Sequence, residues 1–138
     1  TSEIATKLGA HVVAAPERGY GAACLSGIAY AQQSKPDIYI FLDADYSDHP
    51  EDMTNIISAL LENKLDLVIG SRTLGGAEPG ALLPQARFGN WLATRLMYLR
   101  FGYLYSDLGP FRAIRAEAIE HLKMQDRNFG WTVEMQIK

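Results

Sequence analysis

The chain has 138 residues, of which 48% are hydrophobic and 21% are charged, and its formal net charge is −3. This composition predicts one globular domain, residues 1–138, with a hydrophobic core. The acidic balance and the lack of a basic block argue against a nucleic-acid partner. No apolar run reaches the about 18 residues that a membrane-spanning helix needs. The single cysteine, Cys24, cannot form an internal disulfide, which favours a reduced, cytoplasmic protein.

Strands and helices are predicted in alternation along the chain. Short apolar runs rich in β-branched residues predict strands at 11–15, 37–42 and 65–70. Apolar residues at helical spacing predict helices at 19–33, 50–62, 84–104, 116–122 and 131–137, and residues 107–114 are predicted to be extended. Strands joined through helices imply crossover connections and a mostly parallel sheet, so the fold class is α/β.

The start of the helix at 50–62 carries a capping signal. Asp48 precedes the helix, and Glu51 follows three residues later, which is the spacing of a capping box. Pro50 is tolerated in a first helical turn. We therefore expect the Asp48 side chain to cap this helix.

Two carboxylates follow the predicted strand at 37–42. Asp43 and Asp45 are separated by one residue, so in extended backbone both side chains can point to the same side. In open α/β sheets, ligands bind outside the carboxyl ends of strands. Two carboxylates held close together repel one another unless a cation joins them, and oxygen ligands suit Mg²⁺ or Mn²⁺. The pair therefore predicts a cation site, usually shared with a substrate phosphate.

Four segments in this order resemble those of family 2 glycosyltransferases with the GT-A fold. The similarity is strongest to the branch of dolichyl-phosphate mannose synthases and polyprenyl-phosphate glucosyltransferases. The acidic run at 42–52 resembles the metal-binding Asp-x-Asp region of that family. The other three segments are 18–22, Gly70-Ser71-Arg72 with Gly75-Gly76, and 107–112. The resemblance implies a Rossmann-type α/β sheet flanked by helices.

The resemblance also implies a reaction and a set of site residues. The reaction is transfer of a sugar, with inversion, from a UDP- or GDP-sugar to an acceptor such as a polyprenyl phosphate. A hydroxyl acceptor needs a general base, whereas a phosphate acceptor needs cationic partners more. The implied metal ligands are Asp45, Asp43 and Ser47, the implied bases are Asp107 and then Glu134, and the implied substrate-binding residues are Arg72, Arg112, Gly19, Gly21 and Asp43.

The chain departs from the family at its beginning. Residues 1–5 resemble the helix that follows the family's second strand, so two strands and a helix that hold much of the nucleotide are missing. A sheet without those strands would leave unpaired edges and exposed apolar surface. We therefore expect either a homo-oligomer or a piece of a longer protein.

Two alternatives to a glycosyltransferase stay open. A hydrophobic strand followed by Asp-x-Asp-x-Ser also resembles the nucleophile motif of haloacid dehalogenase-type phosphatases, although no later acidic pair follows. The chain could instead be a non-catalytic or incomplete binding module. The aromatic residues between 88 and 105 are interpreted mainly as core, with an interfacial helix as the alternative. A lipid-phosphate acceptor would place the protein at the surface of the cytoplasmic membrane.

Overall fold

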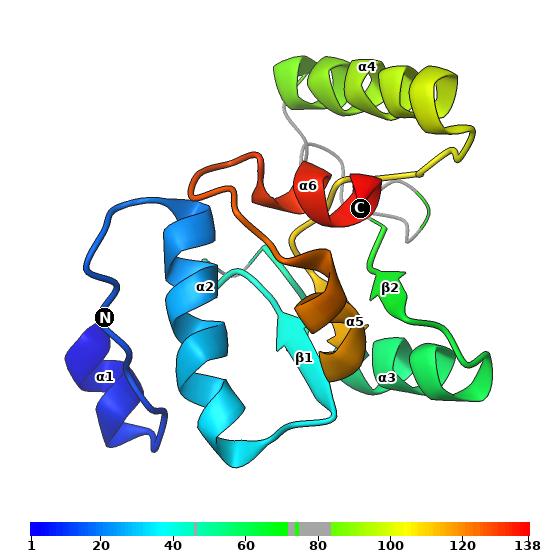
Figure 1. The fold of residues 1–138 in the computed structure, drawn as a ribbon. Helices are drawn as coiled ribbons and strands as arrows, with labels where there is room; N and C mark the ends of the chain where they lie inside the picture. The colour runs from blue at the N-terminus through cyan, green and yellow to red at the C-terminus, as the bar shows by residue number, and fades with distance from the viewer. Residues whose placement is uncertain (46, 72–73, 75–83) are drawn as a thin grey trace.

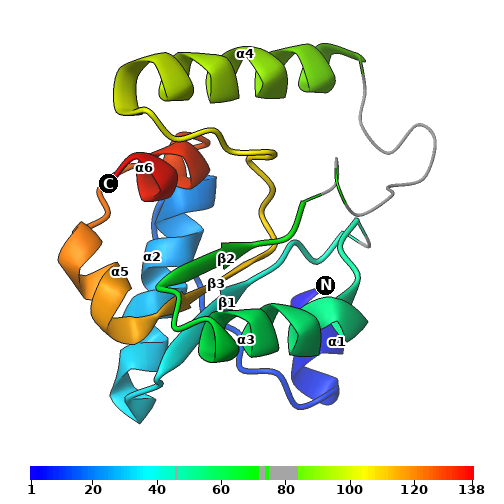
Figure 2. The same cartoon turned by 90° about the vertical axis from the view of Figure 1, so that its right-hand side faces the viewer.

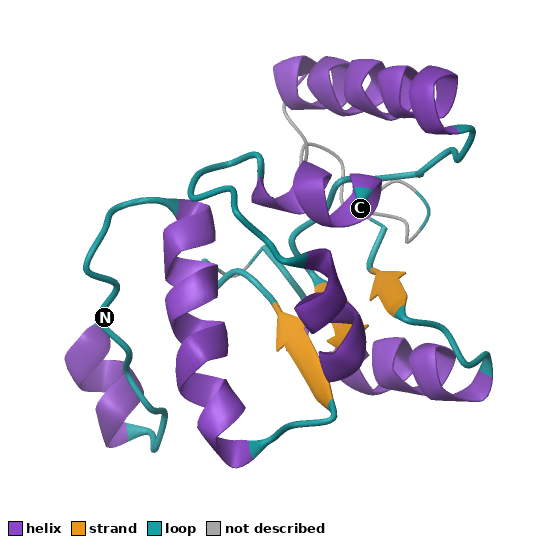
Figure 3. Ribbon diagram, viewed as in Figure 1, coloured by secondary structure: helices purple, strands orange, loops and turns teal. Residues whose placement is uncertain are grey.

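The structure is a computed structural model that describes residues 1–45, 47–71, 74 and 84–138. It has a central three-stranded sheet between helices (Figures 1 and 3). The elements in chain order are α1 Ser2–Lys7, α2 Tyr20–Ala31, the 3₁₀ turn Gln32–Ser34, β1 Ile38–Phe41, the 3₁₀ turn Pro50–Asp52, α3 Met53–Glu62, β2 Leu67–Ile69, α4 Pro84–Phe101, β3 Arg112–Arg115, α5 Ala116–Leu122 and α6 Trp131–Ile137.

The α/β class is confirmed, but the described strand pairs are antiparallel. The strand order is β1-β3-β2, and β3 is antiparallel to both of its neighbours. β1 and β2 therefore run in the same direction, as the crossover through α3 requires, and β3 lies between them. The mostly parallel sheet is thus not what the described strands form, because the segment predicted only as extended supplies the central strand.

The predicted strand at 11–15 is wrong. This segment has no strand structure, and Val12 and Val13 are 50% and 38% exposed. A β-branched run becomes a strand only when a neighbouring strand accepts its hydrogen bonds. No described strand lies beside this segment, so it stays an irregular, exposed connection between α1 and α2.

Alternating side chains divide the core between the two faces of the sheet. Tyr39 and Ile114 point to the face covered by α2, α5 and α6, where they pack with the fully buried Trp131. Ala113 points to the opposite face, where it packs with Ile56 and Leu60 of α3. Figure 2 shows the two layers on either side of the sheet. This period-two alternation fixes the register of the strands.

The capping prediction for α3 is also wrong. The helix has no side-chain cap, and its first turn is preceded by the 3₁₀ turn at Pro50–Asp52. The Asp48 carboxylate instead accepts a hydrogen bond from the backbone N–H of Asp43 at 2.8 Å. Asp48 therefore closes the acidic loop rather than the helix.

Candidate active site

The acidic loop follows β1 directly and is shaped by its own side chains. Asp48 bridges back to Asp43, as above. Asp45 accepts two hydrogen bonds on Oδ1, from the backbone N–H of Ser47 at 3.0 Å and from the Ser47 hydroxyl at 2.5 Å. The loop is therefore folded by local hydrogen bonds, with the Asp45 side chain exposed to solvent and Asp43 half-buried beneath it.

These hydrogen bonds favour the ionised form of Asp45. The Ser47 hydroxyl, and after it the Ser47 backbone N–H, lower the pKa of the Asp45 carboxyl below its ordinary value. Ser47 was expected as a metal ligand, and in this structure its hydroxyl is directed at Asp45. Carboxylate oxygens such as those of the exposed Asp45 suit a hard divalent cation. In the described part of the chain, no group of three or more acidic, histidine or cysteine side chains gathers to hold a metal. A cation here would take its remaining ligands from phosphate and water.

Tyr20 and Cys24 form a half-buried group near Asp43 to which the sequence motifs assign no role. Tyr20, the first residue of α2, has its pKa raised by burial first, and then by the nearby Cys24 and Asp43. Burial, and then Asp43, raise the pKa of the Cys24 thiol to about 11. Cys24 is therefore a neutral thiol beside the core, whereas a nucleophilic cysteine needs a lowered thiol pKa. The position of Tyr20 between two glycines was the only sequence signal for this group.

Arg112 lies inside the protein and contacts backbone carbonyls. It is 0% exposed, and its Nη1 donates to the Thr132 carbonyl oxygen at 3.2 Å. Its Nη2 donates to the carbonyl oxygens of Gly109 and Leu108. Burial lowers the pKa of Arg112 to about 10, although neighbouring groups including Asp107 oppose that shift. These contacts tie the loop before β3 to α6, and a guanidinium with no exposed surface does not present itself to a substrate phosphate.

Asp107 is also buried, with 2% of its surface exposed. Its Oδ1 accepts a hydrogen bond from the backbone N–H of Leu108 at 2.8 Å, and its carbonyl oxygen accepts one from Gln136 at 3.1 Å. The same Leu108 N–H also points at the Asn90 side-chain oxygen, at 3.0 Å. Asp107 thus lies where α4, α6 and β3 approach one another, close enough to Arg112 to influence its pKa.

Glu134, the second expected base, is fully occupied by structural hydrogen bonds. Its two oxygens accept bonds from the backbone N–H groups of Gln125 and Asp126, the shortest at 2.7 Å. Lys138 approaches Oε1 at 2.7 Å. Burial alone would raise the pKa of Glu134, but the bonds from Lys138, Asp126 and Gln125 outweigh burial and lower it. A carboxylate with a lowered pKa and occupied oxygens is a poor proton acceptor.

Gly19 and Gly21 allow close packing between α2 and the segment 126–128. Gly19 has φ +149°, and a Cβ atom on either glycine would collide with backbone atoms of Asp126 or Arg127. The N–H of Gly21 donates to the Asn128 carbonyl oxygen at 3.2 Å. The Gly21 amide is thus used within the protein, and Gly21 is buried whereas Gly19 is half-buried. Arg72, with Gly75 and Gly76, lies outside the described residues.

The structure brings together part of the expected site. Arg112 pairs with Phe41 at the carboxyl end of β1, and Asp43 follows two residues later. Asp43 and Arg112 both influence the pKa of Tyr20, and Asp107 influences that of Arg112. Glu134 is directed at the segment 125–126 instead.

Comparisons with known proteins identify what the chain is similar to. Residues 1–123 match the family model described as glycosyl transferase family 2. An uncharacterised protein of Methanocaldococcus jannaschii is 36% identical over 127 residues, covering 88% of this chain and 51% of that protein. A protein of Mycobacterium bovis named as an uncharacterised glycosyltransferase is 31% identical over 139 residues, covering 100% of this chain and 61% of its own length.

One relative with a more specific name is less similar to this chain. The undecaprenyl-phosphate mannosyltransferase of Micrococcus luteus is 24% identical over 124 residues, which cover 87% of this chain and 50% of that enzyme. The chain thus spans about half the length of the curated relatives it matches.

Proposed function

We propose a function on one premise: the chain belongs to glycosyl transferase family 2, as the match over residues 1–123 shows. The proposed reaction is metal-dependent transfer of a hexose, with inversion, from a UDP- or GDP-sugar to an acceptor. A polyprenyl phosphate is the proposed acceptor, because one relative is named as an undecaprenyl-phosphate mannosyltransferase. Membership of this family argues against the phosphatase alternative.

The acidic loop is the proposed site for the donor diphosphate. Asp45 and Asp43 would hold a divalent ion, and Ser47 would orient Asp45 through its two hydrogen bonds. Bound there, Mg²⁺ or Mn²⁺ offsets the negative charge that develops on the leaving nucleoside diphosphate. Asp48 contributes by fixing the backbone at Asp43. Since Asp45 is ionised and exposed, its Oδ2, which takes neither bond from Ser47, is the oxygen proposed to meet the ion.

The acceptor side of the site is proposed around Asp107 and Arg72. Of the two expected bases, Asp107 is proposed first, because Glu134 has its oxygens filled and its pKa lowered. Asp107 is 2% exposed, so it can meet an acceptor only if the segment that covers it moves. A phosphate acceptor is already ionised and needs a cationic partner more than a base. Arg72 is the proposed partner, whereas Arg112 is proposed to support the loop that carries Asp107.

One observation carries the proposal: Asp45 is an exposed carboxylate in the loop that follows β1, and the hydrogen bonds from Ser47 lower its pKa. The test is calorimetric binding of UDP-glucose and GDP-mannose with and without Mn²⁺. We expect binding that requires Mn²⁺ and is lost in Asp45→Ala. Asp37→Ala is the matched control, because Asp37 is exposed at the opposite end of the same strand.

Two results would count against the proposal. Binding that is unchanged in Asp45→Ala would remove the metal role from this loop. Lack of binding to either nucleotide sugar would favour the non-catalytic or incomplete module. Transfer activity is a separate measurement, in which a short polyprenyl phosphate and the corresponding alcohol are compared as acceptors.

A lipid acceptor also implies contact with a membrane. Among the described residues, no helix is long and apolar enough to span a bilayer. A lipid-phosphate acceptor is the reason for proposing that this part of the protein works at the cytoplasmic face of a membrane.

A further inference from the structure

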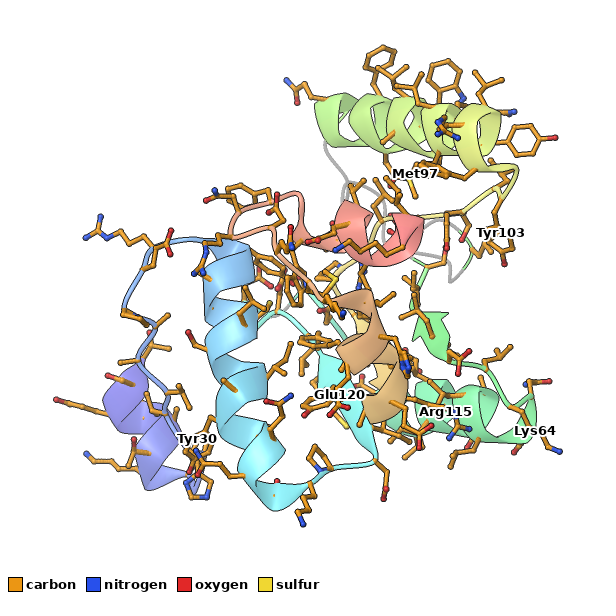
Figure 4. The ribbon with its side chains drawn as sticks, viewed as in Figure 1. Tyr30, Lys64, Met97, Tyr103, Arg115 and Glu120 are labelled. Atoms are coloured by element: carbon orange, nitrogen blue, oxygen red, sulfur yellow. The ribbon has the colours of Figure 1, made fainter. Side chains whose placement is uncertain are left out.

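Helix α4 leaves most of its large apolar side chains exposed. The residues it turns toward the protein are Thr94 and Met97, which are 6% and 5% exposed, and Asn90, which bonds to the Leu108 N–H. Figure 4 shows Met97 pointing from α4 toward the body of the protein. The other sides of the helix and the turn after it carry large exposed apolar side chains, at Phe88, Trp91, Leu92, Leu96, Tyr98, Leu99, Phe101, Tyr103 and Leu104. We call this set the α4 surface.

A surface of this kind is unusual on a soluble protein. Surface helices normally turn their apolar stripe inward and their polar face to water. Here Leu99 is 79% exposed and Phe88 is 63% exposed, while the inward side includes a threonine and an asparagine. In both views α4 lies at one end of the molecule, next to α6 (Figures 1 and 2). Contiguous exposed apolar side chains of this kind mark an interaction site.

The charged residues of α4 and of the turn after it are all positive. Residues 84–106 contain three arginines and no acidic residue, although the whole chain carries a net charge of −3. Arg95 and Arg100 are exposed on the helix, and the Arg100 guanidinium lies 5.2 Å from the centre of the Phe101 ring. Aromatic residues are enriched where a protein meets the interface of a bilayer, and basic residues near that surface are attracted to anionic lipid.

We propose that the α4 surface docks on anionic phospholipid, with α4 lying in the plane of the membrane interface. Its arginines would meet the negative headgroups while Trp91, Leu96 and Leu99 enter the boundary with the acyl chains. A second copy of the chain fits less well. A symmetric dimer would bring two α4 helices together, and these helices have arginines but no acidic residue to pair with them.

This inference deepens the proposed function, since it names the surface through which the enzyme would reach a lipid acceptor. It does not use the acidic loop. Donor binding and vesicle binding therefore test different parts of the protein, and either can fail without the other.

The test is co-sedimentation of the 138-residue chain with vesicles of phosphatidylcholine alone or mixed with phosphatidylglycerol. We expect binding at least about tenfold tighter to the anionic vesicles and weaker binding as salt is added.

The double variant Leu96→Glu with Leu99→Glu should abolish vesicle binding. Leu61→Glu on α3 is the matched control, since Leu61 is 49% exposed away from α4. Each neutralised arginine, Arg95→Gln or Arg100→Gln, should weaken binding roughly fivefold.

A second readout locates the contact within the protein. Trp91 is 53% exposed and Trp131 is 0% exposed, so brominated lipid should quench Trp91 fluorescence only. Quenching should therefore disappear in Trp91→Phe.

Three results would overturn the proposal: equal binding to both kinds of vesicle, binding retained in the double glutamate variant, or no binding at all. A dimer that Leu96→Glu with Leu99→Glu dissociates, without vesicle binding, would assign the α4 surface to a second copy instead.

Discussion

Both hydrogen-bond donors of Ser47 converge on a single oxygen of Asp45, at 3.0 Å from the backbone nitrogen and 2.5 Å from the hydroxyl. The acidic motif is therefore more than two carboxylates at the end of a strand. Its second aspartate is held in one orientation by the residue two positions later. This arrangement explains how an exposed carboxylate keeps a lowered pKa.

Substitution of Ser47 should change the titration of Asp45. In Ser47→Ala the hydroxyl bond is lost, so the pKa of Asp45 should rise toward its ordinary value, as measured by NMR of the side-chain carboxyl carbon. A proton should then compete with Mn²⁺ at a higher pH than in the wild type. Ser34→Ala is the control, since the Ser34 hydroxyl bonds only locally, to the Ala31 carbonyl oxygen. An unchanged Asp45 titration would show that the hydroxyl bond does not form in solution.

Two glycines of α2 should respond in opposite ways to alanine. A Cβ at Gly21 would collide with the backbone of Asp126, whereas a Cβ at Gly27 meets nothing within 4 Å. Gly21→Ala should destabilise the fold by about 1–3 kcal/mol, the usual cost of overpacking. Gly27→Ala should stabilise it by about 0.5–1 kcal/mol, the helix-propensity difference.

Urea unfolding of the two variants measures this contrast. If Gly21→Ala were as stable as the wild type but bound donor more weakly, the glycine would serve the substrate rather than the packing of α2 against 126–128. That result would restore the role that the family resemblance implies for it.

Arg112 is expected to be essential for stability. Arg112→Lys keeps the charge but cannot reach the carbonyl oxygens of Thr132 and Gly109 together. We expect a loss of about 3 kcal/mol, in the range found when a buried charged network loses a partner. Arg115→Lys is the control, because Arg115 makes one bond, at 3.0 Å, to the Leu65 carbonyl oxygen near the surface.

The thermal midpoint separates the two roles considered for Arg112. A large fall in the midpoint for Arg112→Lys, with a small one for Arg115→Lys, supports the structural role. An unchanged midpoint together with weaker acceptor binding would instead assign Arg112 to the substrate phosphate.

Local patterns predicted local structure well. The helices at 116–122 and 131–137 were predicted with the bounds that the structure shows, and β1 lies within its predicted strand. Their signals are apolar spacing and nearby turn residues, which act over a few positions. The segment 11–15 has the same kind of β-rich signal, yet it forms no strand, because pairing depends on a neighbour that its own residues do not encode.

The candidate site likewise has one part that local sequence predicts and another that depends on tertiary packing. The place of Asp43 and Asp45 after β1 follows from a short run of residues. The burial of Arg112 and the occupation of Glu134 depend on α6 and the segment 125–126, which tertiary packing brings into position. A motif could identify these residue types but could not show that their polar atoms already have partners within the protein.

Glu134 provides a pH-dependent test of that conclusion. Its pKa is lowered in the folded protein, so the unfolded chain binds a proton more readily near the ordinary value of 4.5. The stability that Glu134 contributes is therefore complete above that pH and is lost as the pH falls through its folded pKa.

Glu134→Gln should lower the free energy of unfolding by about 1.5 kcal/mol at pH 7, because the charge-assisted bonds from Gln125 and Asp126 weaken. The wild type and the variant should converge in stability at low pH. Urea unfolding at pH 7 and at pH 3 measures both effects, with Glu62→Gln at the exposed end of α3 as the control. A variant that keeps wild-type stability at pH 7 but loses sugar transfer would return Glu134 to the role of general base.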